Sequence, residues 1–254
     1  MPRYIVSGVH SDKDTARFTK FLAEVPLSKY RAQYAPVKIV EMDLPKDIHA
    51  LDLMYETYWA QKEFISFETF YGRYSKAYAK PLERFRKKIG MCKNCFYKGL
   101  PARIYRTWAS IVTQIHGGYV AGGVFGYKNV SMSGDLDHKG ADFRVIYTIP
   151  LNVQVKKETK SREVRMEKTF QKKLDGAFVT IHYFVPQLKI IQEPKKRNGE
   201  YKKAYSEFSD RYLKPKFLHV LPNGFVVFQP ALFEKLKGEV DEGKLKAWFL
   251  KGFH

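Results

Sequence analysis

The segment from Thr107 to Tyr127 places the strongest constraint on the fold, because it contains no charged residue and is about as long as a membrane span. It is not uniformly apolar, since the part up to His116 shows a helical stripe and the rest is rich in glycine. The glycines are Gly117, Gly118, Gly122, Gly123 and Gly126. We therefore expect a buried helix that ends at the first of these glycines and leads into a glycine-rich turn or strand, with no membrane span.

The helix that enters this segment is expected to begin with Pro101 in its first turn. Its apolar face is formed by residues at three- and four-residue spacing, namely Ile104, Trp108, Ile111 and Ile115. The earlier stretch from Leu51 to Gly90 repeats aromatic and aliphatic residues at the same spacing. Aromatics at helical spacing are usually buried, so we interpret them as core rather than as a platform on which nucleic-acid bases stack.

The period of the pattern changes in the second half of the chain. Residues 141–147 and 152–156 alternate between apolar and polar positions, and the short connection between them is suited to a hairpin. Another strand is expected from Ala177, and a turn followed by a short apolar strand from Leu221. The chain then closes on a Lys-rich amphipathic helix from Pro230.

These elements predict an α/β protein in one domain, because no internal repeat or low-complexity linker marks a boundary. The domain would cover residues 1–254. Residues 1–116 would form a mostly helical part, and residues 117–254 a sheet, a basic loop and the C-terminal helix.

The charge of the chain indicates a polyanionic partner. A formal net charge of +19 and a pI near 9.7 are typical of proteins that bind nucleic acid, with an anionic membrane surface as the second candidate. The amino terminus lacks the apolar core and small-residue cleavage site of a signal peptide, so we expect the protein to stay in the cytoplasm.

The two cysteines, Cys92 and Cys95, form a lone CxxC pattern. A tetrahedral zinc site would need a second such pair or suitably spaced histidines. We therefore favour free structural thiols over a redox pair, and a redox pair over zinc.

Polar residues gather around the predicted hairpin in a pattern that suits metal-assisted hydrolysis of a phosphodiester. Alternation directs Val153 and Val155 to one face of their strand and Gln154 and Lys156 to the other. Asp142 stands at the start of the preceding strand, and Asp137 lies in a short polar loop closed by Gly140.

Magnesium prefers hard oxygen ligands and keeps several waters, so Asp142 would anchor Mg²⁺, while Asp137 would bind the same ion or a second one. Gln154 would add its amide oxygen. Lys156 would orient and help to deprotonate the attacking water.

The same pattern has less specific interpretations. An Asp followed by a Gln-x-Lys strand arises by chance on many protein surfaces, and a nucleic-acid-binding protein without catalysis would explain the charge equally well. A structure-specific nuclease, such as a repair or junction enzyme, is a further alternative. The scattered histidines form no zinc-like HxxxH, and there is no GxGxxG or Walker pattern.

Basic residues around the hairpin are candidates for contacts with the DNA backbone. They are Lys157, which is also an alternative to Lys156 as the catalytic lysine, then Lys160, Arg162 and Arg165, and a second patch of Arg103 and Arg106. The plainer interpretation of each is a solvated charged surface. The loop from Glu158 to Arg165 also directly follows the catalytic strand, where its side chains could reach base edges.

Several segments, taken in chain order, resemble those of the TaqI-like type II restriction endonucleases. They are YAPVKIVEMDLP (34–45), YETYW (55–59), SFETF (66–70), ARIYRTWASIVTQIH (102–116), LDHKGADFRV (136–145), VQVKKET (153–159) and LPNGFVVF (221–228). This family belongs to the PD-(D/E)XK nuclease group. The resemblance matches Asp137 and Asp142 to the family's acidic pair, and Gln154 with Lys156 to its Q-x-K strand.

The resemblance implies a PD-(D/E)XK-like central mixed sheet flanked by helices, and Mg²⁺-dependent cleavage of both strands of DNA at the palindrome TCGA. A cognate DNA methyltransferase that acts on the same site would be the functional partner. Symmetric cleavage of two antiparallel strands needs two active sites related by a two-fold axis, so we expect a homodimer on DNA.

Overall fold

A computed structural model describes residues 10–158, 174–184 and 216–243 of the chain. Within these ranges the protein is a mixed α/β structure with many helices and a small mixed sheet. No helix in the described part is both long enough and apolar enough to cross a bilayer. The segment of residues 194–214, expected to form a basic loop leading into a helix, and most of the basic segment after Lys157 lie outside the described residues.

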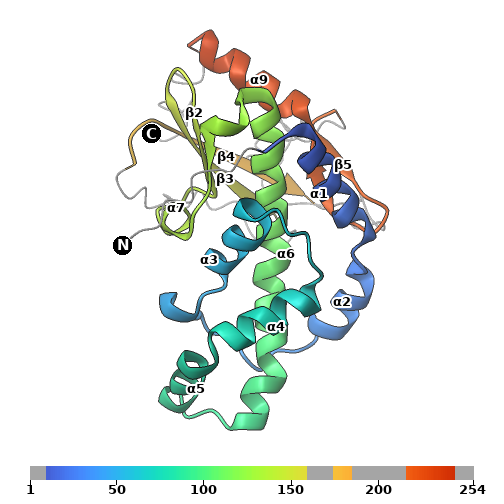
Figure 1. Cartoon of the computed structure of the whole chain (residues 1–254), viewed down its shortest axis with the longest axis vertical. Coiled ribbons are helices and arrows are strands. Elements are labelled where there is room, and N and C mark those ends of the chain that lie inside the picture. Colours follow the sequence, from blue (N-terminus) through green and yellow to red (C-terminus); the bar gives the residue numbers. More distant parts are fainter. Residues whose placement is uncertain (1–9, 159–173, 185–215, 244–254) are drawn as a thin grey trace, which may run out of the picture.

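The N-terminal part is helical, as the residue spacing predicts (Figure 1). Its helices are α1 (Asp12–Glu24), α2 (Leu27–Tyr34), a 3-10 turn (Lys46–Ile48), α3 (Leu51–Met54) with a π-helical continuation (Tyr55–Ala60), α4 (Phe67–Ala77) and α5 (Ala79–Lys88). Helix-spaced aromatics such as Trp59, Phe70 and Tyr74 are fully buried, which confirms that they form core.

Helix α6 (Lys93–Phe125) differs from the expectation at both ends. Pro101 lies inside the helix rather than in its first turn, and the helix continues through four glycines to end at Gly126, whose φ is 91°. The predicted glycine-rich turn or strand is therefore wrong. Close packing explains the glycines, because a Cβ on Gly117 would stand 3.3 Å from the Phe228 ring and one on Gly118 would stand 3.0 Å from the Met132 sulfur.

The main sheet has the strand order β1-β2-β3-β4. The strands are β1 (Val130–Ser131), β2 (Phe143–Ile146), β3 (Pro150–Glu158) and β4 (Ala177–Phe184). β2 and β3 form the predicted antiparallel hairpin, with Phe143 opposite Val153, while β4 runs parallel to β3. Val153 and Val155 are buried and Gln154 and Lys156 are partly exposed, as alternation predicts.

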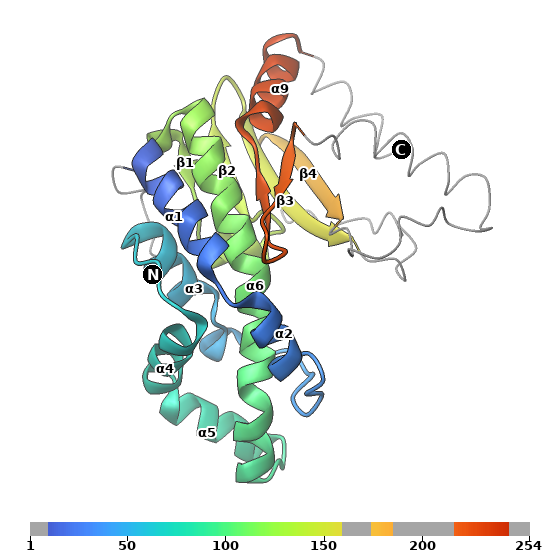
Figure 2. The same cartoon turned by 90° about the vertical axis from the view of Figure 1, so that its right-hand side faces the viewer.

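A second, two-stranded sheet consists of β5 (Leu218–Val220) and β6 (Val226–Phe228), and it leads into α9 (Pro230–Asp241). The turn-and-strand expectation from Leu221 and the helix from Pro230 are confirmed. Helix α6 runs along the whole molecule between these parts: α1, α3 and α4 pack along it, and the sheet and α9 lie against its C-terminal half (Figures 1 and 2).

The cysteine pair lies at the start of α6. The Cys92 sulfur caps the helix by accepting a hydrogen bond from the Cys95 backbone N–H at 3.1 Å. Both residues are exposed and free. The two thiols are thus free, and Cys92 serves as a helix cap.

Candidate active site

Asp142 is held at the start of β2 by two backbone groups of β3. Its N–H donates to the Val153 carbonyl at 2.8 Å, and its carboxylate accepts the Val155 N–H at 2.5 Å. These two bonds place Asp142 beside Gln154, the residue between the two valines. The Asp142 side chain is buried, with only 5% of the residue exposed.

Asp137 reaches Asp142 from a short helix rather than from the expected loop. This helix, α7 (Gly134–His138), begins at Ser133, whose hydroxyl accepts the Leu136 N–H at 3.2 Å, and the chain reverses at Gly140 with a φ of 90°. The Ser cap and the left-handed glycine explain why a helical turn forms there. The side chains of Asp137 and Asp142 are in hydrogen-bonding contact.

The positions of Asp137 and Asp142 disfavour the ionised form of both carboxyl groups. Burial raises the pKa of Asp142 well above its ordinary value, and the charge of Asp137 raises it further, while the Val155 N–H and the nearby charge of Lys156 act in the opposite direction. Burial also raises the pKa of Asp137, despite the hydrogen bond with Asp142 and the charge of His138. An added cation would relieve the repulsion between the two groups.

The two adjacent lysines of β3 lie in different surroundings. Lys156 is close enough to Asp142 for its charge to influence the pKa of that carboxyl group. Lys157 lines a separate cavity together with Arg31 and Arg106. Of the two lysines, the structure thus brings Lys156 toward the acidic pair.

Tyr55 is a residue of this site that the sequence did not reveal. Its hydroxyl is buried and forms no hydrogen bond with another described residue. Burial raises its pKa, and the charges of Asp137, Asp142 and Asp52 raise it further, so the phenol lies close to the acidic pair. The aromatic spacing of the segment marked Tyr55 only as a core residue, and no sequence signal distinguished it from its buried neighbours.

The proposed basic patch of Arg103 and Arg106 is engaged in contacts within the protein. Arg103 forms an ion pair with Asp43 at 3.1 Å, and Arg106 donates to the carbonyls of Val37 and Val40 at 3.1 and 3.3 Å. Both arginines therefore tether the segment before α3 to α6. Lys160, Arg162 and Arg165 lie outside the described residues, as does most of the loop in which base contacts are expected.

The described residues include a donor set that suits magnesium but no complete metal cage. Among them, no group of three or more His, Cys, Asp or Glu side chains is arranged to hold a metal ion. Mg²⁺ is usually bound through one or two carboxylates while it keeps several waters. The contacting pair of Asp137 and Asp142, with their raised pKa values, fits that requirement.

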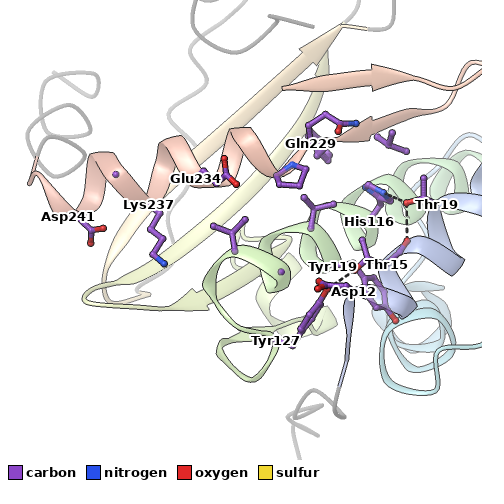
Figure 3. A pocket seen from close by; sticks show the side chains of 17 residues that line it. Asp12, Thr15, Thr19, His116, Tyr119, Tyr127, Gln229, Glu234, Lys237 and Asp241 are labelled. Atoms are coloured by element: carbon purple, nitrogen blue, oxygen red, sulfur yellow. Dashed lines mark hydrogen bonds between the residues drawn. The ribbon is translucent and has the colours of Figure 1, made fainter. Parts of the chain in front are cut away.

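A cavity lined by other residues is separate from the acidic pair. It has a volume of about 860 Å³ and lies between α1, the C-terminal half of α6 and α9 (Figure 3). The buried His116 lies beside it, where burial lowers the pKa of the imidazole to about 3 and Thr19 contacts its Nε2 atom at 3.0 Å. None of the residues predicted for catalysis or DNA binding lines this cavity.

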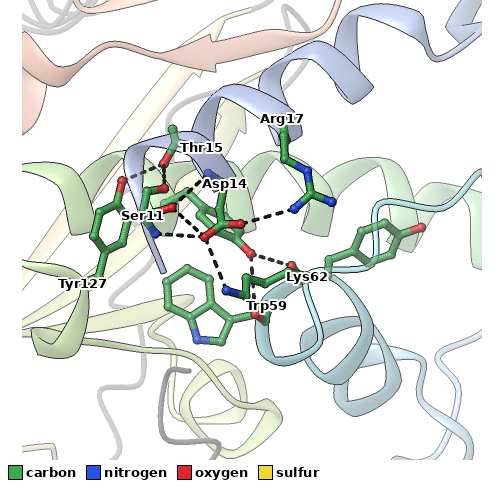
Figure 4. A network of polar contacts seen from close by, with 9 residues as sticks. Ser11, Asp14, Thr15, Arg17, Trp59, Lys62 and Tyr127 are labelled. Atoms are coloured by element: carbon green, nitrogen blue, oxygen red, sulfur yellow. Dashed lines mark hydrogen bonds and ion pairs between the residues drawn. The ribbon is translucent and has the colours of Figure 1, made fainter. Parts of the chain in front are cut away.

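A second buried aspartate has a different environment (Figure 4). Asp14 accepts hydrogen bonds from the backbone and hydroxyl of Ser11, both at 3.0 Å, and forms ion pairs with Lys62 and Arg17, both at 3.4 Å. Burial alone would raise its pKa, but the Ser11 hydrogen bond and the charge of Lys62 outweigh burial, so the pKa is lowered.

Comparison with known proteins identifies the family of this chain. The chain is 32% identical over 251 residues to the type II restriction enzyme TaqI of Thermus aquaticus, a match that covers 91% of this chain and 90% of that protein. It is 31% identical over 250 residues to the type II restriction enzyme TthHB8I of Thermus thermophilus, with the same coverage.

Type II restriction enzymes are site-specific deoxyribonucleases and generally use divalent metal ions. No solved structure gives a significant match. The sequence model of the TaqI restriction endonuclease family matches residues 15–240, and the chain therefore belongs to this family.

Proposed function

We propose that this protein cleaves both strands of DNA at a short palindrome in a Mg²⁺-dependent reaction, and that Asp137 and Asp142 bind the metal. The observation that carries the proposal is the contact between the buried carboxyl group of Asp142 and the partly buried carboxyl group of Asp137, whose pKa values are both raised. Such a pair is unfavourable on its own, and divalent cation binding would compensate its charge.

The roles of the other residues follow from their position around Asp142. When bound, Mg²⁺ would polarise the scissile phosphate and favour ionisation of water. Gln154, beside Asp142 on the exposed face of β3, would supply an amide oxygen toward the metal. Lys156 would orient the attacking water, help to remove its proton and offset negative charge that develops on the phosphate. Tyr55 would donate its hydroxyl hydrogen to the acidic pair.

The architecture supports a PD-(D/E)XK-like core in a single domain that covers residues 1–254. A mixed sheet with helices around it, and an acidic pair beside a Q-x-K strand, are the features that this group of nucleases would require. TCGA as the target rests on the family resemblance, because charge and spacing do not distinguish one palindrome from another. The protein would act as a homodimer on DNA, in the cytoplasm, alongside a methyltransferase of the same specificity.

Digestion of a sequenced genome tests the proposal most directly. The protein would be incubated with purified DNA and Mg²⁺, with a matched reaction in EDTA, and the fragment ends would be sequenced. Ends at TCGA in both strands would support the full proposal. Another palindrome would reject only TCGA, whereas random or non-palindromic ends would reject the symmetric dimer. No cleavage with retained DNA binding would favour the silent DNA-binding protein, and cleavage of branched DNA alone would favour a junction nuclease.

The roles of the two lysines can be separated by matched substitutions. Lys156→Ala should abolish cleavage while the affinity for uncleaved DNA is largely retained. Lys157→Ala, which removes the neighbouring charge from the other side of β3, should leave a clearly measurable cleavage rate constant at saturating DNA. Inactivity of the Lys157 variant alone would assign the catalytic ammonium to Lys157 instead.

A further inference from the structure

A small cavity whose lining does not include Asp142 lies between the helices and the sheet. It has a volume of about 140 Å³ and is bounded by α2, α6, the ends of β3 and β4, and the turn that precedes β6. Three cationic residues line it: Arg31 from α2, Arg106 from α6 and Lys157 from β3. The hydroxyl-bearing residues Ser110 and Thr113 of α6 also line it.

Within the described part of the chain, the cavity concentrates positive charge without a neutralising anion. No carboxylate is among the described residues that line it. The Arg31 and Lys157 side chains form no ion pair or hydrogen bond with another described residue, and Arg106 donates only to the neutral carbonyls of Val37 and Val40. Burial lowers the pKa of Lys157, and the charge of Arg31 lowers it further. The charges of Arg31 and Lys157 thus repel each other.

The fold holds the charges in place. Gly224, in the turn before β6, has a φ of 88°, and a Cβ there would stand 3.3 Å from Nη1 of Arg31, so the turn packs closely against the guanidinium group. Lys157 is paired with Tyr183 across the parallel β3–β4 ladder, and Thr113 is hydrogen-bonded to the Tyr183 hydroxyl. The turn at Gly224 therefore packs against Arg31, and Tyr183 neighbours Lys157.

The chemistry of the lining selects an oxyanion. Guanidinium and ammonium groups are hydrogen-bond donors with no acceptor, and charge-assisted bonds to phosphate oxygens are among the strongest that proteins form. Pockets for drug-sized ligands typically have volumes of about 300–1,000 Å³, so a cavity of about 140 Å³ accommodates a single phosphate group rather than a whole nucleotide.

We infer that Arg31, Arg106 and Lys157 form a binding site for one phosphate group, which is either a phosphodiester of the nucleic-acid backbone or free inorganic phosphate. The phosphate bound there is not the one that is cleaved, because successive β3 residues point to opposite faces and Lys156, not Lys157, lies toward Asp142. The nucleic-acid source rests on the proposed function, whereas the site itself does not.

Thermal unfolding in inorganic phosphate tests the site without DNA or metal. Ionic strength would be held constant with sodium chloride. A ligand that binds only the folded protein raises its Tm, so phosphate should raise the Tm of the wild type. It should raise the Tm equally in Arg84→Gln, which removes an exposed charge from α5, far from the cavity. The rise should disappear in Arg31→Gln combined with Lys157→Gln.

An equal rise in Tm for the double variant and the wild type would overturn the proposal, as would no rise in the wild type. Arg31 is exposed, so the single Arg31→Gln variant should fold even if the double variant does not. Phosphate should raise the Tm of this variant less than that of the wild type, and an equal rise would overturn the proposal. Neither measurement depends on cleavage. A protein that failed to cut DNA would therefore contradict the proposed function and leave this test intact.

The salt dependence of DNA binding distinguishes the two sources of phosphate. If the site holds a backbone phosphodiester, Arg31→Gln should reduce the log-log slope of affinity against salt for a short duplex by roughly one unit, while Arg84→Gln should not. An unchanged slope together with a lost phosphate response in thermal unfolding would confirm the site and assign it to free phosphate.

Discussion

Asp14 and Asp142 are buried to nearly the same degree, with exposed fractions of 7% and 5%, but their pKa values are shifted in opposite directions. Burial alone would raise both pKa values. Asp14 is surrounded by Ser11, Lys62 and Arg17, which stabilise its charged form. Asp142 instead contacts a second carboxyl group, Asp137, and its one hydrogen bond from Val155 does not compensate.

The counter-charges that the fold supplies distinguish a structural carboxylate from a functional one. Asp14 has its cations within the chain, and it completes the capping box that begins α1. Asp142 is buried in a place where its ionisation is unfavourable, and the fold supplies only a partial counter-charge from Lys156. A group retained at such a cost to folding is a strong candidate for binding a cation from outside the chain.

Loss of cleavage should be the largest difference between the two aspartates. Asp142→Asn should reduce the rate of cleavage by several orders of magnitude while DNA affinity is retained, because the carboxylate binds metal but repels phosphate. Asp14→Asn is the matched control, with the same chemical change at a similarly buried position, and should cleave at a rate near that of the wild type below its Tm. Single-turnover cleavage and gel-shift assays check both values, and robust cleavage by Asp142→Asn would reject the site.

Stability at neutral pH should change in opposite directions. Asp14→Ala should lower the free energy of unfolding by about 1–3 kcal/mol, because it removes a capping-box acceptor and an ion-pair partner. Asp142→Asn should raise it, because the substitution removes a buried charge next to Asp137. Urea unfolding without divalent metal measures both. A loss of stability in both variants would mean that Asp142 is a structural group like Asp14.

The opposite pKa shifts of Asp14 and Asp142 should also make stability depend on pH, and this effect should be smaller than the effects of the substitutions. The pKa of Asp142 in the folded state is above its ordinary value of 3.8, so the stability that depends on this group is complete below pH 3.8 and is lost as the pH rises toward the raised pKa. The lowered pKa of Asp14 gives the opposite sign: its contribution is present above pH 3.8 and is lost as the pH falls through the lowered pKa.

Each group changes the free energy of unfolding by at most about 1.4 kcal/mol per pH unit. Urea unfolding of the wild type and each variant across this range isolates the two contributions as differences. Parallel curves for the wild type and Asp142→Asn would show that the carboxyl group ionises as easily in the folded protein as in the unfolded chain.

The sequence predicted the local pattern of the site well and its surroundings poorly. The alternation of apolar and polar residues around Val153 and Val155 was sufficient to place Gln154 and Lys156 on one face of a hairpin, because successive side chains of a strand point to opposite faces. It did not reveal Tyr55, since helical spacing marks a residue as buried without saying which distant group it meets. Nor did it show that Arg103 and Arg106 bind the segment before α3, because that contact joins residues far apart in the chain.

The expected end of α6 was wrong for a related reason. Glycine and proline weaken an isolated helix, and local propensity therefore predicted a break after His116 and a start at Pro101. In the folded protein, Phe228, Met132 and Tyr127 pack against the glycines so closely that larger side chains would not fit. Tertiary packing thus decides the helix boundary, and it depends on residues that are far away in the sequence.

The uninterrupted course of α6 over 33 residues also determines which changes of chain length the protein can tolerate. Arg103 and Arg106 fix one part of the helix to the segment before α3, while Gly117 and Gly118 face the sheet region. One inserted residue between these parts would turn one of them by about 100° relative to the other and move it by about 1.5 Å along the axis. The helix therefore fixes both the distance and the rotation between its two ends. Insertions should be accepted in the surface loops but not between Arg106 and Gly117.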